Sequence, residues 1–151
     1  MGQNGNDNPK IFIRTLLYST AHLGRYLQNM YIKVHMNGAN QNFNIWAYGD
    51  DKIVRGSGLF ISKTGHSSYH HFLLPNEIAN FDFAPGEYKI EIFIEVVNRS
   101  PKKIFEERIT LSEQQSKELR MGKAIYYDWA PDSQSYIGHS DIKQILLGTL
   151  Q

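Results

Sequence analysis

Cysteine is absent from this chain of 151 residues. Its absence excludes a disulfide scaffold, a thiolate zinc site and a thiol nucleophile, and it leaves the cellular compartment open. An excess of one charge is also lacking, because 16 Lys and Arg residues are balanced by 15 Asp and Glu residues. The chain therefore lacks the excess of positive charge that is typical of proteins that bind nucleic acids or anionic membrane surfaces. We therefore expect neither nucleic acid nor a membrane among the partners.

Long hydrophobic runs and nucleotide-binding motifs are missing as well. No window approaches the roughly 18 apolar residues of a membrane span. Neither Gly-x-x-x-x-Gly-Lys-Ser/Thr nor a Gly-x-Gly-x-x-Gly before a helical pattern occurs. Residues 1–9 are polar and lack the basic and apolar regions of a signal peptide. We expect 1–9 to be a flexible leader, 10–139 to be one folded domain, and 140–151 to be a tail or short helix that could lead into a further domain.

Alternation of apolar and polar residues is the strongest pattern that is present. Residues 30–36 and 88–96 carry apolar side chains at every second position, which is the period of a half-buried β-strand. Shorter segments of strand character, bounded by turn residues, lie at 10–17, 42–48, 59–62, 69–74, 81–83, 104–111 and 124–129. Pro85-Gly86 favours a type II turn before residue 88, because proline presets its φ and glycine accepts a positive φ.

Asn37-Gly38 predicts a β-hairpin, because both positions of its tight turn need a positive φ. A two-residue turn at this place pairs Ile32 with Phe43 and Met30 with Ile45. Both apolar sets then lie on the same face of the hairpin, and this agreement supports the register.

One helix is indicated after residue 112. Ser112 and Gln115 match the capping-box pattern, and Gly122 stands where a C-cap glycine belongs. Between residues 113 and 120 only Leu119 is apolar, so we expect a surface connection that cannot form half of a core. A second short helix could form at 141–147 with Ser140 as its cap.

These segments predict an all-β fold. Short strands separated by frequent turns are typical of a sandwich or a barrel. We expect a two-layer antiparallel β-sandwich of seven or eight strands, with one short connecting helix. The pattern is similar to immunoglobulin-like and C2-like sandwiches at the level of architecture.

Histidine and aspartate offer two alternatives for metal binding. His70 and His71 point to opposite faces of a strand, whereas His66 and His70 share a face and could hold zinc if a carboxylate joined them. Loop carboxylates at one end of a sandwich could bind calcium, as the C2-like resemblance implies, although Asp in turns commonly serves turn chemistry alone. The loop candidates are Asp50, Asp51, Asp128 and Asp132. We assign no metal site and no cofactor.

Aromatic residues supply the candidate binding site. If the apolar set of the hairpin faces the core, its register places four polar or aromatic side chains on the opposite, outer face: Tyr31, His35, Trp46 and Tyr48. Several aromatic side chains on one exposed face are typical of a recognition surface. The alternative is that another segment of the chain covers this face.

A second candidate for the binding site is Tyr126. Tyr127 and Trp129 are expected in the core, and alternation then turns Tyr126 outward.

The functional hypothesis follows mainly by elimination, because no catalytic constellation is complete. We expect a non-enzymatic β-sandwich recognition module that binds a protein or glycan partner, which is an inference from fold class. The second hypothesis is a structural or assembly subunit that self-associates. The third is a metal-dependent hydrolase that uses His66, His70 and a loop carboxylate.

Overall fold

The computed structural model describes residues 2–3, 9–49, 54–55, 58–75 and 81–140. In these residues the chain is mostly β-strand, the sheets are antiparallel, and a single helix is present. The predicted all-β fold is therefore confirmed.

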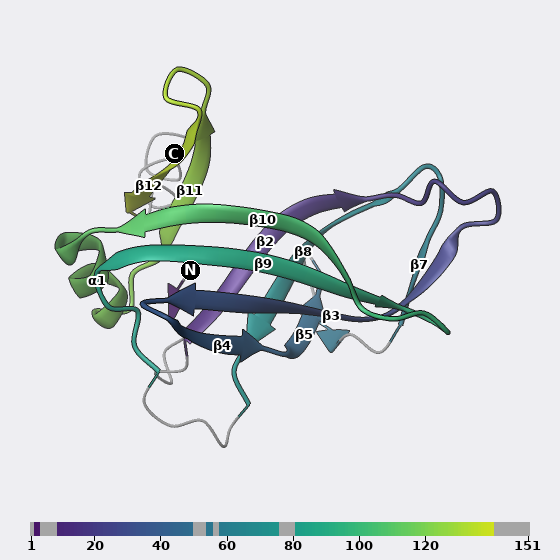
Figure 1. Cartoon of the computed structure of the whole chain (residues 1–151), viewed down its shortest axis with the longest axis horizontal. Coiled ribbons are helices and arrows are strands. Elements are labelled where there is room, and N and C mark those ends of the chain that lie inside the picture. Colours follow the sequence, from purple (N-terminus) through teal and green to yellow (C-terminus); the bar gives the residue numbers. More distant parts are fainter. Residues whose placement is uncertain (1, 4–8, 50–53, 56–57, 76–80, 141–151) are drawn as a thin grey trace, which may run out of the picture.

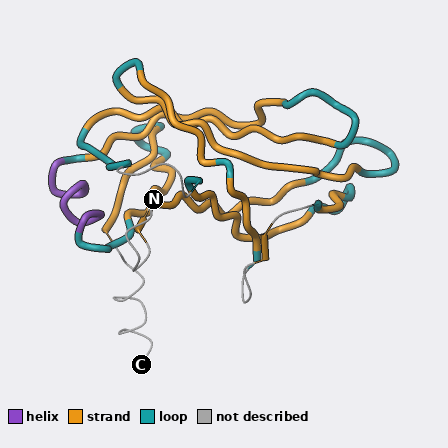
Figure 2. Tube along the Cα trace, turned by 90° about the horizontal axis from the view of Figure 1, so that it is seen from below, coloured by secondary structure: helices purple, strands orange, loops and turns teal. Residues whose placement is uncertain are grey.

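Two larger sheets and one separate hairpin make up the structure. The first sheet contains, in spatial order, β1 (Gly2–Gln3), β2 (Pro9–Leu17), β8 (His66–Leu73), β5 (Ile45–Tyr48) and β6 (Val54–Arg55). The second sheet contains, in spatial order, β10 (Lys102–Leu111), β9 (Gly86–Val96), β3 (Arg25–Met36) and β4 (Ala39–Phe43), and β7 (Leu59–Ile61) also pairs with β3. The hairpin pairs β11 (Ile125–Ala130) with β12 (Ser135–Ser140). The two sheets form separate layers (Figure 2), and β2 and β8 run obliquely behind β9 and β10 (Figure 1).

The described residues form twelve strands, against the seven or eight that the sequence predicts. Part of the difference comes from short pieces, since β1 and β6 have two residues each and the predicted strand 42–48 is divided between β4 and β5. β12 was not predicted. Residues 81–83, predicted as a strand, form a loop that nevertheless buries Phe83.

The hairpin at Asn37-Gly38 is present, and both residues have a positive φ, 49° and 78°. Ile32 lies opposite Phe43 as predicted. The predicted pair of Met30 with Ile45 is wrong, because β4 ends at Phe43 and the chain passes to the first sheet. There Ile45 pairs with Leu73 of β8.

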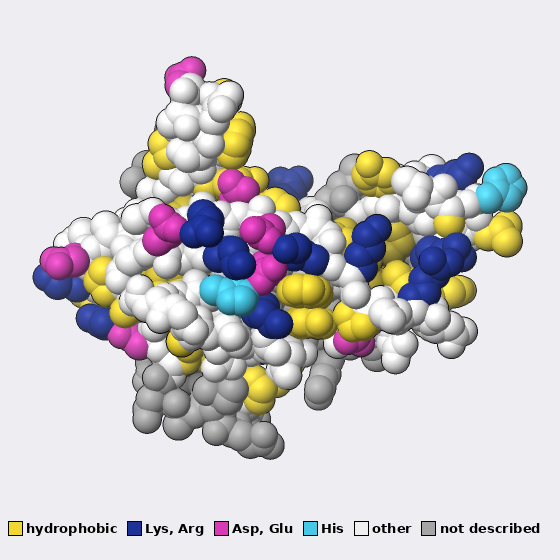
Figure 3. All heavy atoms as spheres, viewed as in Figure 1, with side chains coloured by type: hydrophobic (Ala, Val, Ile, Leu, Met, Phe, Trp, Pro, Cys, Tyr) yellow, Lys and Arg dark blue, Asp and Glu magenta, His cyan; other side chains and the backbone are white. Residues whose placement is uncertain are grey.

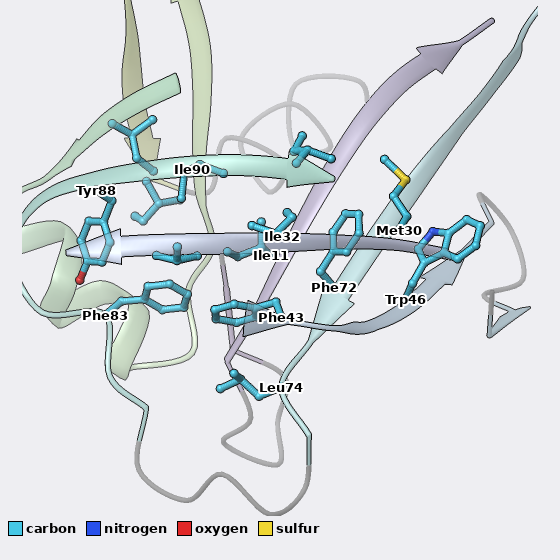
Figure 4. Close-up of a cluster of buried hydrophobic side chains, with 14 of the residues drawn as sticks. Ile11, Met30, Ile32, Phe43, Trp46, Phe72, Leu74, Phe83, Tyr88 and Ile90 are labelled. Carbon is cyan, nitrogen blue, oxygen red and sulfur yellow. The ribbon is translucent and has the colours of Figure 1, made fainter. Parts of the chain in front are cut away.

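The core lies between the two sheets and takes side chains from both (Figure 4). Ile11, Trp46 and Phe72 come from the first sheet, and residues such as Ile32 and Ile90 come from the second. Both sheets therefore bury one face against the other, as the alternation of their residues requires.

Helix α1 (Glu113–Arg120) begins and ends as predicted. The Ser112 hydroxyl accepts a hydrogen bond from the Gln115 N–H at 3.1 Å, and the Gln115 side chain accepts one from the Ser112 N–H at 2.9 Å. Gly122, with φ 84°, donates its N–H to Leu119 O at the other end. The helix is a connection with one anchored side, because Leu119 is buried and the Ser116 hydroxyl donates to Phe83 O at 2.7 Å.

The predicted ends of the domain are described only in part. β1 lies within the segment 1–9 that was predicted as a leader, and it pairs with Pro9 and Lys10 of β2. The helix predicted at 141–147 lies outside the described residues, and Ser140, its predicted cap, is the last residue of β12.

We predict that Gly86→Val lowers the free energy of unfolding by about 1–3 kcal/mol. Gly86 begins β9 with a φ of 145°, a conformation that β-branched residues rarely adopt, and an added Cβ would lie 3.0 Å from Met36 Cε. Urea unfolding of the two proteins measures the difference. An unchanged midpoint would contradict this account of Gly86.

Candidate functional site

Tyr31 and His35 lie together on the outer face of β3, as the register predicts. The Tyr31 ring stacks on Phe93 of β9, with centroids 5.2 Å apart and planes inclined by 6°. The Lys33 ammonium lies 5.5 Å from the centroid of the same Phe93 ring. Both Tyr31 and His35 are half-buried, so little of their ring surface is left free.

The polar groups beside this stack are paired with one another. His35 Nε2 contacts Glu91 Oε1, and Lys103 Nζ donates to Glu91 Oε2 at 3.0 Å. Burial by itself would raise the pKa of the Glu91 carboxyl, but hydrogen bonds from Lys103 and His35 outweigh it and hold this pKa below its usual value. Burial, followed by the charge of Glu95, raises the pKa of Tyr31. We therefore regard this face as an internally satisfied surface.

The predicted outward position of Trp46 is wrong. Trp46 is 2% exposed, and its indole N–H donates to His70 Nδ1 at 3.2 Å inside the core. The reason is the change of sheet at Asn44, after which Trp46 pairs with the buried Phe72 of β8 and shares its face. The alternation of β4 thus does not continue into β5.

Tyr48 is also separated from the predicted group. It pairs with His70, its ring lies 5.3 Å from that of Trp46, and it is half-buried. The structure places Tyr31 and His35 on one face of β3 but Trp46 and Tyr48 in the other sheet. The exposed four-residue patch predicted from the sequence does not exist.

Tyr126 lies on β11 against the first sheet, with its ring edge-on to Phe12 at 5.6 Å. Tyr127 is half-buried, its hydroxyl donates to Thr110 O at 3.0 Å, and burial raises its pKa to about 12. The predicted burial of Trp129 is wrong, since this residue is 49% exposed. The β11–β12 hairpin projects from the two sheets (Figure 1), and there the Trp129 ring packs on Tyr136, its partner across the hairpin.

The histidines considered as zinc ligands, His66, His70 and His71, lie on β8 in the first sheet. His70 is buried and His71 is on the opposite face, where burial and then the charge of Lys10 lower its pKa. Among the described residues, no group of three His, Asp or Glu side chains is placed to hold a metal ion. Asp50 and Asp51 lie outside the described part of the chain. The hydrolase hypothesis therefore gains no ligand set from the structure.

A cavity of about 1260 Å³ lies between the two sheets. It was not predicted from the sequence. Its lining includes residues of β2 and β10, and each of these strands has an edge that is largely unpaired with another strand among the described residues. β2 pairs with β8 along its length but with β1 only at Pro9 and Lys10, and β10 pairs with β9 alone.

The lining of this cavity is largely apolar. From β2 it takes successive residues, including Ile11, Phe12 and Ile13, whose side chains alternate in direction, so the cavity borders the strand edge itself. From β9 it takes the inward side chains of Ile90, Ile92, Ile94 and Val96. Side chains from the two sheets and from the β11–β12 hairpin, Tyr126 among them, thus line one space without filling it.

A β-bulge shapes the side of the cavity formed by β10. The register with β9 shifts between Lys103 and Phe105, after which Phe105 pairs with Ile92 and Glu107 with Ile90. Ile104 and Phe105 both line the cavity, and each is 39% exposed. The sequence carries one signal for this bulge. Ile104 and Phe105 are consecutive apolar residues, in a strand where apolar and polar residues otherwise tend to alternate.

Comparison of the chain with family models, curated proteins and solved structures finds no match. The described residues contain no helix that is long and apolar enough to cross a membrane.

Proposed function

We propose that this chain is a non-enzymatic β-sandwich binding module, of immunoglobulin-like or C2-like architecture, that binds a protein partner. The partner contributes one extended strand, which enters between β2 and β10. The observation that carries the proposal is the apolar cavity that opens between two strand edges with no strand partner among the described residues.

The free edges supply the backbone part of the recognition. A strand edge presents a row of N–H and C=O groups, and an added strand satisfies them with main-chain hydrogen bonds. The edge of β2 from Ile11 to Leu17 is about 20 Å long at roughly 3.3 Å per residue. This length suits a bound segment of about seven residues.

The cavity supplies the side-chain part. Alternate residues of an added strand point to the same face, so its apolar side chains would enter the space bordered by Ile13, Ile94 and Phe105. Pockets for small ligands commonly measure about 300–1000 Å³, and this cavity is larger. Its apolar lining also favours a protein segment over a glycan, whose hydroxyl groups would lose hydrogen bonds to water there.

The test uses a synthetic nine-residue peptide in which valine alternates with threonine, with both ends blocked. We expect saturable binding by isothermal titration calorimetry, with a negative heat-capacity change from apolar burial, and slower hydrogen exchange of amides in β2 or β10. A peptide of the same sequence with N-methyl groups at alternate residues lacks the edge hydrogen bonds and should bind at least about tenfold more weakly.

Two matched variants place the peptide on the protein. Ile104→Asp puts a charge on the cavity wall, and Val97→Asp makes the same change at a similarly exposed residue that does not line the cavity. Only Ile104→Asp should weaken binding. Absence of saturable binding, equal binding of the N-methylated peptide, or equal loss in both variants would overturn the proposal. Self-association through these edges, blocked by Ile104→Asp, would also overturn it by making a second copy the occupant.

A further inference from the structure

Four of the side chains that line the cavity are cationic. Arg14, Arg25, Arg99 and Lys102 all belong to its lining, and all four are exposed. Figure 3 shows some Lys and Arg side chains at the right-hand end of the molecule, where the β9–β10 turn and the start of β3 lie in Figure 1, and others over the middle and the left-hand end of the same face.

The strand pairings explain why these residues meet. Arg25 lies opposite Ile61, two positions before the Leu27–Val96 pair, and the Arg99 N–H donates to Val96 O at 3.0 Å. Lys102 begins β10 opposite Ile94 of β9. Arg25, Arg99 and Lys102 are thereby held close to the end of β9.

Arg14 belongs to the first sheet, in the half of β2 that leads toward this end. It lies three residues before the end of β2, and its guanidinium lies 5.6 Å from the centroid of the Tyr69 ring. The chain that follows β2 is attached to the residue after β7, since the Ser19 N–H donates to Ser62 O at 3.0 Å. The end of β2 is therefore tied to the strand that pairs with Arg25.

The acidic residues of the lining lie at the other end. Glu107 pairs with Ile90, four residues along β9 from the partner of Lys102, or about 13 Å at roughly 3.3 Å per residue. Asp128 is on β11, beyond the two sheets. Among the described residues, none of the four cations forms an ion pair with a carboxylate. The cavity is thus apolar along its length and positive at one end.

We infer that the partner strand bound in this cavity carries acidic residues at the end that lies against Arg14, Arg25, Arg99 and Lys102. The inference rests on the proposed function and adds to it the charge and the orientation of the bound segment. Like charges placed against this end would raise the free energy of the complex, and opposite charges would lower it, so the four cations select both the partner and its direction.

The test compares blocked peptides that share one alternating valine–threonine body and differ only in a terminal pair: Asp-Asp, Asn-Asn or Lys-Lys. Each pair is placed once at the N-terminal end and once at the C-terminal end, because strands can add in either direction. At low salt, one of the two Asp-Asp peptides should bind at least about tenfold more tightly than its Lys-Lys counterpart. This advantage should shrink at 1 M salt, where the screening length falls to about 3 Å.

Variants of the protein test whether the preference for Asp-Asp depends on the cationic end of the cavity. In the double variant Arg25→Glu with Arg99→Glu the preference should reverse toward Lys-Lys, while the Asn-Asn peptide binds about as before. Arg108→Glu is the control, because Arg108 is an exposed arginine that pairs with Glu87 and does not line the cavity. It should leave the preference unchanged.

The outcomes separate this inference from the proposed function. Equal binding of the three peptide types, or a preference that survives the double variant, overturns the acidic end while strand addition stands. Failure of every peptide to bind overturns the proposed function and this inference with it.

Discussion

Replacing Trp46 with alanine is expected to lower the free energy of unfolding by about 3–5 kcal/mol, the usual range for removing a buried large aromatic side chain. Trp46 is 2% exposed and belongs to the same buried cluster as Met30 (Figure 4). The change removes the packing of its ring on Tyr48 and His70, and it leaves His70 Nδ1 without the indole donor. The cavity left by the ring and the loss of this hydrogen bond both contribute to the lower stability.

Trp129→Ala is the matched control, because Trp129 is the second tryptophan of the chain and is 49% exposed. Its loss should cost much less than that of Trp46. Fluorescence gives an independent reading: in Trp129→Phe the remaining tryptophan should emit at short wavelength and resist quenching by iodide. If both alanine substitutions lowered the free energy of unfolding equally, or if iodide readily quenched Trp46, Trp46 would lie at the surface. Either result would contradict its place in the core.

Trp46 also illustrates which features a sequence can specify. The turn at Asn37-Gly38 and the cap at Ser112 were predicted correctly because each depends on backbone conformations within a few residues. The position of Trp46 depends on where the chain leaves one sheet for another. Apolar residues continue at Phe43 and Ile45 across that point, so the alternation alone does not reveal the crossing at Asn44.

The candidate site could not be predicted from patterns in the sequence. β2 and β10 are far apart in the chain, and the space between them depends on how two sheets are separated, which alternation within a strand does not encode. The sequence identified the inward residues of β9 correctly but gave no sign that several of them border a cavity. Tyr31 and His35 were placed on the correct face, whereas their pairing with Phe93 and Glu91 required the register of β9.

Replacing Ile32 with alanine is expected to lower the free energy of unfolding by about 2–5 kcal/mol. Ile32 is fully buried in β3, between its partners Phe43 and Ile92, and it does not line the cavity. Its removal therefore creates a new void in a packed region. The surrounding strands are paired on both sides and cannot close that void without breaking their register.

Ile94→Ala is the comparison that makes this prediction informative about the cavity. Ile94 faces the same interior from β9, but it is only partly buried and already borders the cavity. Its removal enlarges an existing space, so only the transfer of its smaller buried area is lost, and the cost should be clearly below that of Ile32→Ala. Chemical denaturation of both variants, with equal denaturant dependence as the check on two-state unfolding, measures the difference. Equal costs would mean that Ile94 is packed on all sides in solution. The cavity would then be closed, and no partner strand could enter between β2 and β10.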